Sequence, residues 1–124
     1  MIELEQARVV LKQAMETKGT DFVYNPGGFA GCFYQPMSND DNYVSKTEDD
    51  PKLTTGCLIG VALDLAGETR HHNFNWRVST LALTYPDMMT KEVVDYFYVA
   101  QLYQDLGGTW GDSYDRAEAS LTDK

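Results

Sequence analysis

Cys57 is the residue whose type and position come nearest to catalytic chemistry. It falls in the first turn of a predicted helix, where the helix dipole lowers the pKa of a thiol. A nucleophilic cysteine also needs a base, and His71 or His72 would have to fold back to supply it. The alternative is a small buried hydrophobe, the usual role of a free cysteine, and the apolar neighbours Leu58 and Val61 favour it.

Metal binding is the second chemistry to consider. Structural zinc sites bring their ligands in close pairs such as Cys-x2-Cys, whereas Cys32 and Cys57 are single cysteines. An acidic loop over residues 37–51 has oxygen ligands for calcium but lacks the fixed glycine and distal glutamate of an EF-hand. We therefore predict no metal site and no cofactor.

Tyrosine and tryptophan are the residues with the clearest functional meaning. They concentrate at protein interfaces because one end is apolar and the other forms hydrogen bonds, and they can also stack a nucleotide base. Core filling is the alternative and is expected for most of them. An anionic ligand would in addition require the arginines to converge. The predicted binding residues are Trp76, Tyr85, Tyr96, Tyr103, Trp110, Tyr114, Arg70, Arg77 and Arg116.

Composition and motifs narrow the functional classes. The chain has 124 residues and a net charge of −9, which argues against sequence-independent binding to nucleic acid and against an anionic membrane surface. No Walker A loop, Gly-x-Ser-x-Gly or His-Glu-x-x-His occurs. No signal peptide or membrane span is apparent, and two cysteines do not make a disulfide scaffold. We predict a cytoplasmic protein with reduced thiols that is not an enzyme.

Hydrophobic spacing and capping residues predict the elements. A helix is expected over residues 3–18, and the apolar run over 55–66 predicts a buried helix. Thr90 caps a helix over 91–106, and the Thr-x-x-Asp sequence at Thr109 opens a last helix to about Leu121. Segments 21–24 and 31–35 read as strands around a Pro-Gly-Gly turn. The state of residues 78–84 stays undecided.

These elements predict the architecture. We expect a single α+β domain over residues 1–124, mostly helical, with four or five helices around a buried central helix at about 55–66. A small antiparallel β-hairpin at about 21–35 would pack on the helices. The acidic loop over 37–51 and a frayed C-terminal tail complete the prediction.

Three motifs in this order resemble a group of small uncharacterised proteins of actinobacteria and their bacteriophages. They are Asp21–Tyr24 with Cys32–Tyr34, Gly56–Leu63, and Gln101–Gly111. The resemblance covers about Asp21 to Arg116. It departs in the acidic insertion and at Val61, where the group has histidine. It carries no established activity and implies a phage or prophage setting.

The predicted function is a small, acidic, non-catalytic binding protein, encoded by a bacteriophage, that engages a host or phage protein as an accessory, host-takeover or anti-defence factor. One alternative is a module that sequesters a small ligand or nucleotide in an aromatic pocket. A second is a cysteine-dependent enzyme using Cys57. The long aromatic helix also favours a homodimer.

Overall fold

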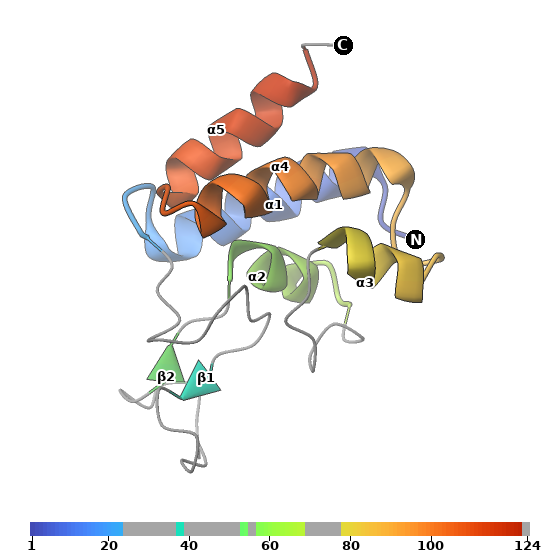
Figure 1. The fold of residues 1–124 in the computed structure, drawn as a ribbon, viewed down its shortest axis with the longest axis horizontal. Helices are drawn as coiled ribbons and strands as arrows, with labels where there is room; N and C mark the ends of the chain where they lie inside the picture. The colour runs from blue at the N-terminus through green and yellow to red at the C-terminus, as the bar shows by residue number, and fades with distance from the viewer. Residues whose placement is uncertain (24–36, 39–52, 55–56, 69–77, 123–124) are drawn as a thin grey trace.

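The computed structural model describes residues 1–23, 37–38, 53–54, 57–68 and 78–122, and this part of the chain contains five helices (Figure 1). The helices are α1 (Leu4–Lys18), α2 (Leu58–Leu65), α3 (Val78–Thr84), α4 (Lys91–Asp105) and α5 (Trp110–Ser120). Two strands of two residues each, β1 (Met37–Ser38) and β2 (Leu53–Thr54), pair antiparallel. The α1 and α4 helices lie side by side, with α2 and α3 below them and α5 rising above.

The helix at the centre of this arrangement is α4, not the predicted helix at 55–66. Among the described elements, α4 contacts each of the other four helices, whereas α2 packs mainly on α1 and α4. The α2 helix is also shorter than predicted, and its last turn exposes Asp64 and Leu65. An apolar run predicts that a helix is buried but not where it lies among the other helices. The sequence therefore could not distinguish a peripheral buried helix from a central one.

Capping residues set the helix boundaries largely as predicted. The Thr90 side chain accepts a hydrogen bond from the Val93 amide at the start of α4, and Thr109 accepts one from the Asp112 amide at the start of α5. Glycines with positive φ follow α1, α2 and α4, a conformation that residues with a Cβ rarely adopt. Residues 78–84, undecided from the sequence, form α3.

The predicted β-hairpin at 21–35 is wrong. The described residues hold no such hairpin; positions 24–36 lie outside them. Val23 forms an isolated antiparallel bridge with Thr109, and the Phe22 carbonyl accepts a hydrogen bond of 2.8 Å from the Trp110 amide. Because strand propensity reflects how a segment packs, a β-prone stretch can pair with a remote connection as readily as with its neighbour. The described fold is helical.

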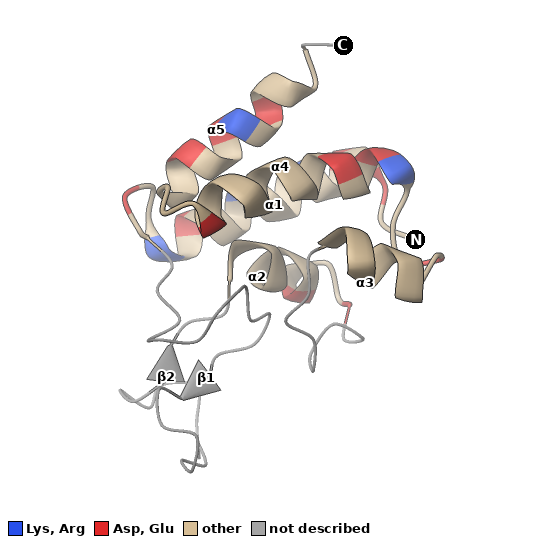
Figure 2. Cartoon of the chain, viewed as in Figure 1, with Lys and Arg blue, Asp and Glu red and all other residues tan. Residues whose placement is uncertain are grey.

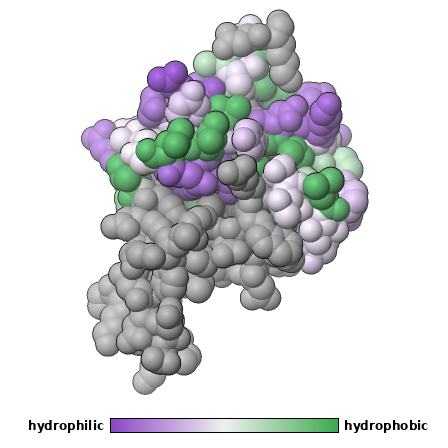
Figure 3. Space-filling view, in the orientation of Figure 1, coloured by the Kyte–Doolittle hydropathy of each residue, from purple (hydrophilic) through white to green (hydrophobic). Residues whose placement is uncertain are grey.

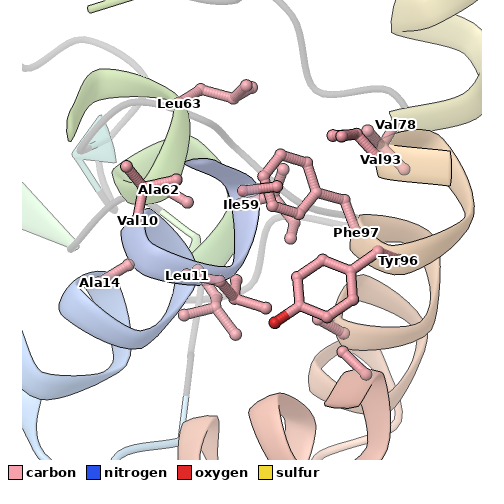
Figure 4. Close-up of a cluster of buried hydrophobic side chains, with 14 of the residues drawn as sticks. Val10, Leu11, Ala14, Ile59, Ala62, Leu63, Val78, Val93, Tyr96 and Phe97 are labelled. Atoms are coloured by element: carbon pink, nitrogen blue, oxygen red, sulfur yellow. The ribbon is translucent and has the colours of Figure 1, made fainter. Parts of the chain in front are cut away.

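The core is formed where α1, α2 and α4 meet (Figure 4). Leu11 from α1, Ile59 from α2 and Phe97 from α4 are fully buried and point toward one another. Val78 brings α3 into the same cluster, and Trp110 and Ala117 bring α5. No helix within the described segments is long and apolar enough to cross a membrane.

Candidate functional site

A pocket of about 280 Å³ opens between the end of α1 and the first turns of α5. Its lining combines three carboxylates, a tyrosine, two threonine hydroxyls and a methionine. We call it the α5 pocket. Its residues are Met15, Thr20, Asp21, Thr109, Gly111, Asp112, Tyr114 and Asp115.

Close backbone contact holds the two walls of the α5 pocket together. The Gly111 amide donates a hydrogen bond of 2.9 Å to the Thr20 carbonyl. A Cβ on Gly111 would lie 2.8 Å from that oxygen, so only glycine allows this approach without a shift of the backbone. Beside it, the Phe22 and Trp110 rings meet edge to face with centroids 4.7 Å apart.

The chemistry of the α5 pocket suits an organic cation. Asp21, Asp112 and Asp115 line the pocket together with the half-buried Tyr114, and an aromatic face also attracts cations. Over the described segments, no group of three or more histidine, cysteine or acidic side chains is placed to hold a metal ion.

A second pocket of similar volume lies at the other end of α1. Glu3, Glu5 and Glu92 line it together with Leu4 and Thr90. It is also acidic, but it has no aromatic wall. This difference makes it a useful control for the α5 pocket.

A polar cluster joins α1, α4 and α5 near Tyr114. The Arg8 guanidinium donates to both carboxylate oxygens of Glu118, at 2.9 and 3.1 Å. The hydroxyl of Tyr96 donates to the same carboxylate at 2.7 Å. Hydrogen bonding to Arg8 lowers the pKa of Glu118, whereas burial and the neighbouring carboxylate raise the pKa of Tyr96.

Replacing Glu118 by alanine removes an acceptor from the buried Tyr96 hydroxyl. We expect a loss of about 2 kcal/mol in the free energy of unfolding, because a buried donor left without its partner costs about that much. Glu118→Gln keeps an acceptor oxygen and is the matched control, expected to lose less. Chemical denaturation measured by circular dichroism gives both values.

The same variants predict a pH dependence. The pKa of Glu118 is lower in the folded chain than its ordinary value of 4.5, so its stabilising effect is present above that value. The effect is lost as pH falls through the lowered pKa. The difference in stability between the wild type and Glu118→Gln should therefore shrink in acid. A difference independent of pH would contradict this assignment.

An arginine and a tyrosine meet on the outer side of α5. The Arg116 guanidinium lies 5.0 Å from the centroid of the Tyr103 ring. Arg116 is also 3.7 Å from the Asp112 carboxylate, one turn earlier on α5, as the sequence spacing predicts. Arg116 is thus already occupied by an aromatic ring and a carboxylate.

The structure separates the predicted binding residues into three groups. Tyr96 and Trp110 are fully buried and belong to the core. Tyr85, Tyr103 and Tyr114 are half-buried at the surface, and Arg116 is exposed. The remaining predictions, Trp76, Arg70 and Arg77, lie outside the described residues. Among the predicted residues that the structure describes, those on α4 and α5 lie near one another, with Arg116 against Tyr103.

Sequence reasoning missed the role of two buried glutamines on α4. The Gln104 side-chain oxygen accepts from the Leu58 amide at the start of α2, at 2.7 Å, and from the Trp110 indole at 3.2 Å. The Gln101 oxygen accepts from the Val78 amide at the start of α3, at 2.7 Å. The sequence did contain a signal for this role. Both glutamines occupy positions whose helical spacing puts them on the face that is otherwise apolar and turned to the core.

Cys57 is fully buried and disulfide-bonded, which corrects the prediction of reduced thiols. The only other cysteine in the sequence, Cys32, lies outside the described residues. In this state Cys57 has no thiol to ionise, so it offers no nucleophile.

Comparison with protein-family models, with curated proteins and with solved structures gives no match. The function therefore has to be argued from the geometry of the chain itself.

Proposed function

We propose that this chain is a non-catalytic binding protein that engages a protein partner through the acidic and aromatic surface of α5. The α5 pocket carries the proposal, because three carboxylates line it together with Tyr114. A lysine or arginine side chain of the partner matches this lining in charge. Its aliphatic stem packs on the tyrosine while its cationic end meets the carboxylates.

The size of the α5 pocket favours a side chain over a whole small molecule. Its volume of about 280 Å³ lies below the range of about 300–1,000 Å³ usual for small-molecule sites. Acidic residues outnumber basic ones along α5, where Figure 2 shows red segments with one blue segment among them. With a net charge of −9, the whole chain attracts a basic partner at long range and speeds the encounter.

The nucleotide-sequestering alternative is less well supported. Two of the aromatic residues it needs, Tyr96 and Trp110, lie in the core and cannot stack a base. Phosphate groups would also meet the carboxylates of the α5 pocket. The disulfide at Cys57 counts equally against the cysteine-dependent enzyme.

The biological setting of the proposal comes from sequence resemblance alone. The motifs that resemble actinobacterial and phage proteins support a role as a phage-encoded accessory, host-takeover or anti-defence factor. We propose the host cytoplasm as the place where it acts. The disulfide at Cys57 counts against that compartment, since such bonds persist mainly in oxidising surroundings.

A comparison of two charge variants tests the proposed site. Asp115→Lys reverses a charge in the α5 pocket, and Glu5→Lys makes the same change of net charge in the pocket that lacks an aromatic wall. Each variant and the wild type would serve as bait in host lysate at low salt, with recovered proteins quantified by mass spectrometry. We expect the wild type and Glu5→Lys to recover equal amounts of at least one protein. Asp115→Lys should recover at least about tenfold less of that protein.

Two results would contradict the proposal. The first is a wild type that recovers nothing above a bead control. The second is recovery of the same proteins by Asp115→Lys as by Glu5→Lys. Proteins lost equally from both variants respond to net charge and do not identify the α5 pocket.

A further inference from the structure

The outward side of α4 carries an apolar row. Val94, Tyr98, Leu102 and Leu106 recur at intervals of four and form one ridge, which we call the α4 ridge. Leu102 is 38% exposed, and Leu106, the residue that follows α4, is 73% exposed. Val94 and Tyr98 are half-buried and also pack against the core. Figure 3 shows hydrophobic surface over the C-terminal half of α4. The opposite side of α4 already packs on the other four helices.

Opposite charges mark the two ends of the α4 ridge. Lys91 stands at the start of α4 and Asp105 at its end, and both are exposed, as are the acidic Glu92 and Asp95 in the first turns of the helix. Lys91, Tyr98 and Asp105 are spaced seven residues apart, so the two charges lie in line with the tyrosine midway between them. At a rise of 1.5 Å per residue the charges are separated by about 21 Å along the helix.

This pattern is complementary to itself when one copy is reversed. In an antiparallel pair centred on Tyr98, each Lys91 lies opposite Asp105 of the partner subunit, and Val94 lies opposite the partner's Leu102. A parallel pair would place like charges together at both ends, which is unfavourable. The antiparallel arrangement also satisfies two-fold symmetry, in which the same patch serves both subunits.

We propose that two copies of this chain associate through the α4 ridge, antiparallel, with Tyr98 at the two-fold axis. The apolar row supplies the buried surface, and the two Lys91 to Asp105 pairs select the direction. The α5 pocket contains no residue of α4, so this association goes beyond the proposed function and does not depend on it.

Complementary charge reversals test the direction of pairing. Lys91→Glu alone and Asp105→Lys alone each place like charges at both ends of the dimer. We expect each variant to associate at least about tenfold more weakly than the wild type in sedimentation velocity. An equimolar mixture restores both opposite-charge pairs, so native mass spectrometry should find the mixed dimer in excess over either homodimer. A wild type that stays monomeric at high concentration, or a mixture that fails to associate, overturns the proposal.

A second pair of variants tests the α4 ridge without touching Asp105, which accepts a hydrogen bond from the Gln104 side chain. Leu102→Glu buries a charge opposite an apolar residue, and we expect association to weaken by about a hundredfold. Leu83→Glu makes the same change on α3, where Leu83 is 82% exposed and outside the α4 ridge. It should associate like the wild type. Equal association by the two variants overturns the proposal even if Asp105→Lys fails to fold.

Discussion

Replacing Gln104 by methionine is expected to lower the free energy of unfolding by about 4 kcal/mol. Methionine is unbranched and has a similar length, so it fills the same space without the side-chain oxygen. The Leu58 amide and the Trp110 indole then lose the acceptor they share. Each buried donor left without a partner costs about 1–3 kcal/mol, which makes this the largest effect expected from one substitution.

The matched control is Gln101→Met. Gln101 lies one turn earlier on the same face of α4 and is equally buried, and its side-chain oxygen accepts from the Val78 amide. We expect a loss of about 2 kcal/mol. Urea denaturation followed by circular dichroism and by tryptophan fluorescence measures both variants. Equal losses would mean that the shared acceptor on Gln104 is not what stabilises the starts of α2 and α5.

The structural reason for these effects is that α4 caps its neighbours. The first amides of a helix have no acceptor within that helix, and Cys57, the residue before α2, makes no side-chain capping bond. The Gln104 side chain supplies it from another helix, and Gln101 does the same for α3. Two glutamines on one face of α4 therefore determine where two other helices begin.

Breaking the disulfide at Cys57 is the second large effect we expect. Loss of a native disulfide from a small domain costs about 3 kcal/mol, chiefly because the unfolded chain gains freedom. Cys57 is fully buried, so reductant should act slowly on the folded protein and quickly once it is partly unfolded. Urea denaturation with and without reductant measures the difference.

A cysteine variant separates the effect of losing the disulfide from any other effect of the reductant on stability. Cys57→Ala should show the lower stability without reductant and should not change further when reductant is added. Alkylation followed by mass spectrometry counts the free thiols of the wild type directly. Two free thiols in protein purified without reductant, with no effect of reductant on stability, would restore the prediction of reduced cysteines.

Local sequence signals were sufficient for most helix boundaries. Thr90 and Thr109 cap α4 and α5 as their positions predict, and glycines with positive φ follow α1, α2 and α4. These signals work because a cap or a left-handed glycine acts within one turn of the helix it limits. The Asp112 and Arg116 pair was predictable for the same reason, since four residues is one helical turn.

Long-range pairing decided what those signals could not. Residues 21–23 have the composition of a strand, yet Val23 pairs with Thr109, and the Phe22 backbone bonds to Trp110. Burial of Tyr96 and Trp110 was equally undetermined, because an aromatic residue suits a core as well as a surface. The α5 pocket exists only because Thr20 and Gly111, which are far apart in sequence, meet in the fold. The Gly111 nitrogen lies 2.9 Å from the Thr20 carbonyl oxygen.

The acidic charge, the mainly helical character and the caps at Thr90 and Thr109 were predictable, because charge and capping are properties of single residues and of neighbours within a turn. Tertiary packing made α4 the central helix and brought its two buried glutamines to the starts of α2 and α3. It also decided that Tyr114, and not Tyr96 or Trp110, reaches the surface. The physical reason is that burial depends on which faces meet, and helical periodicity gives a face without naming its partner.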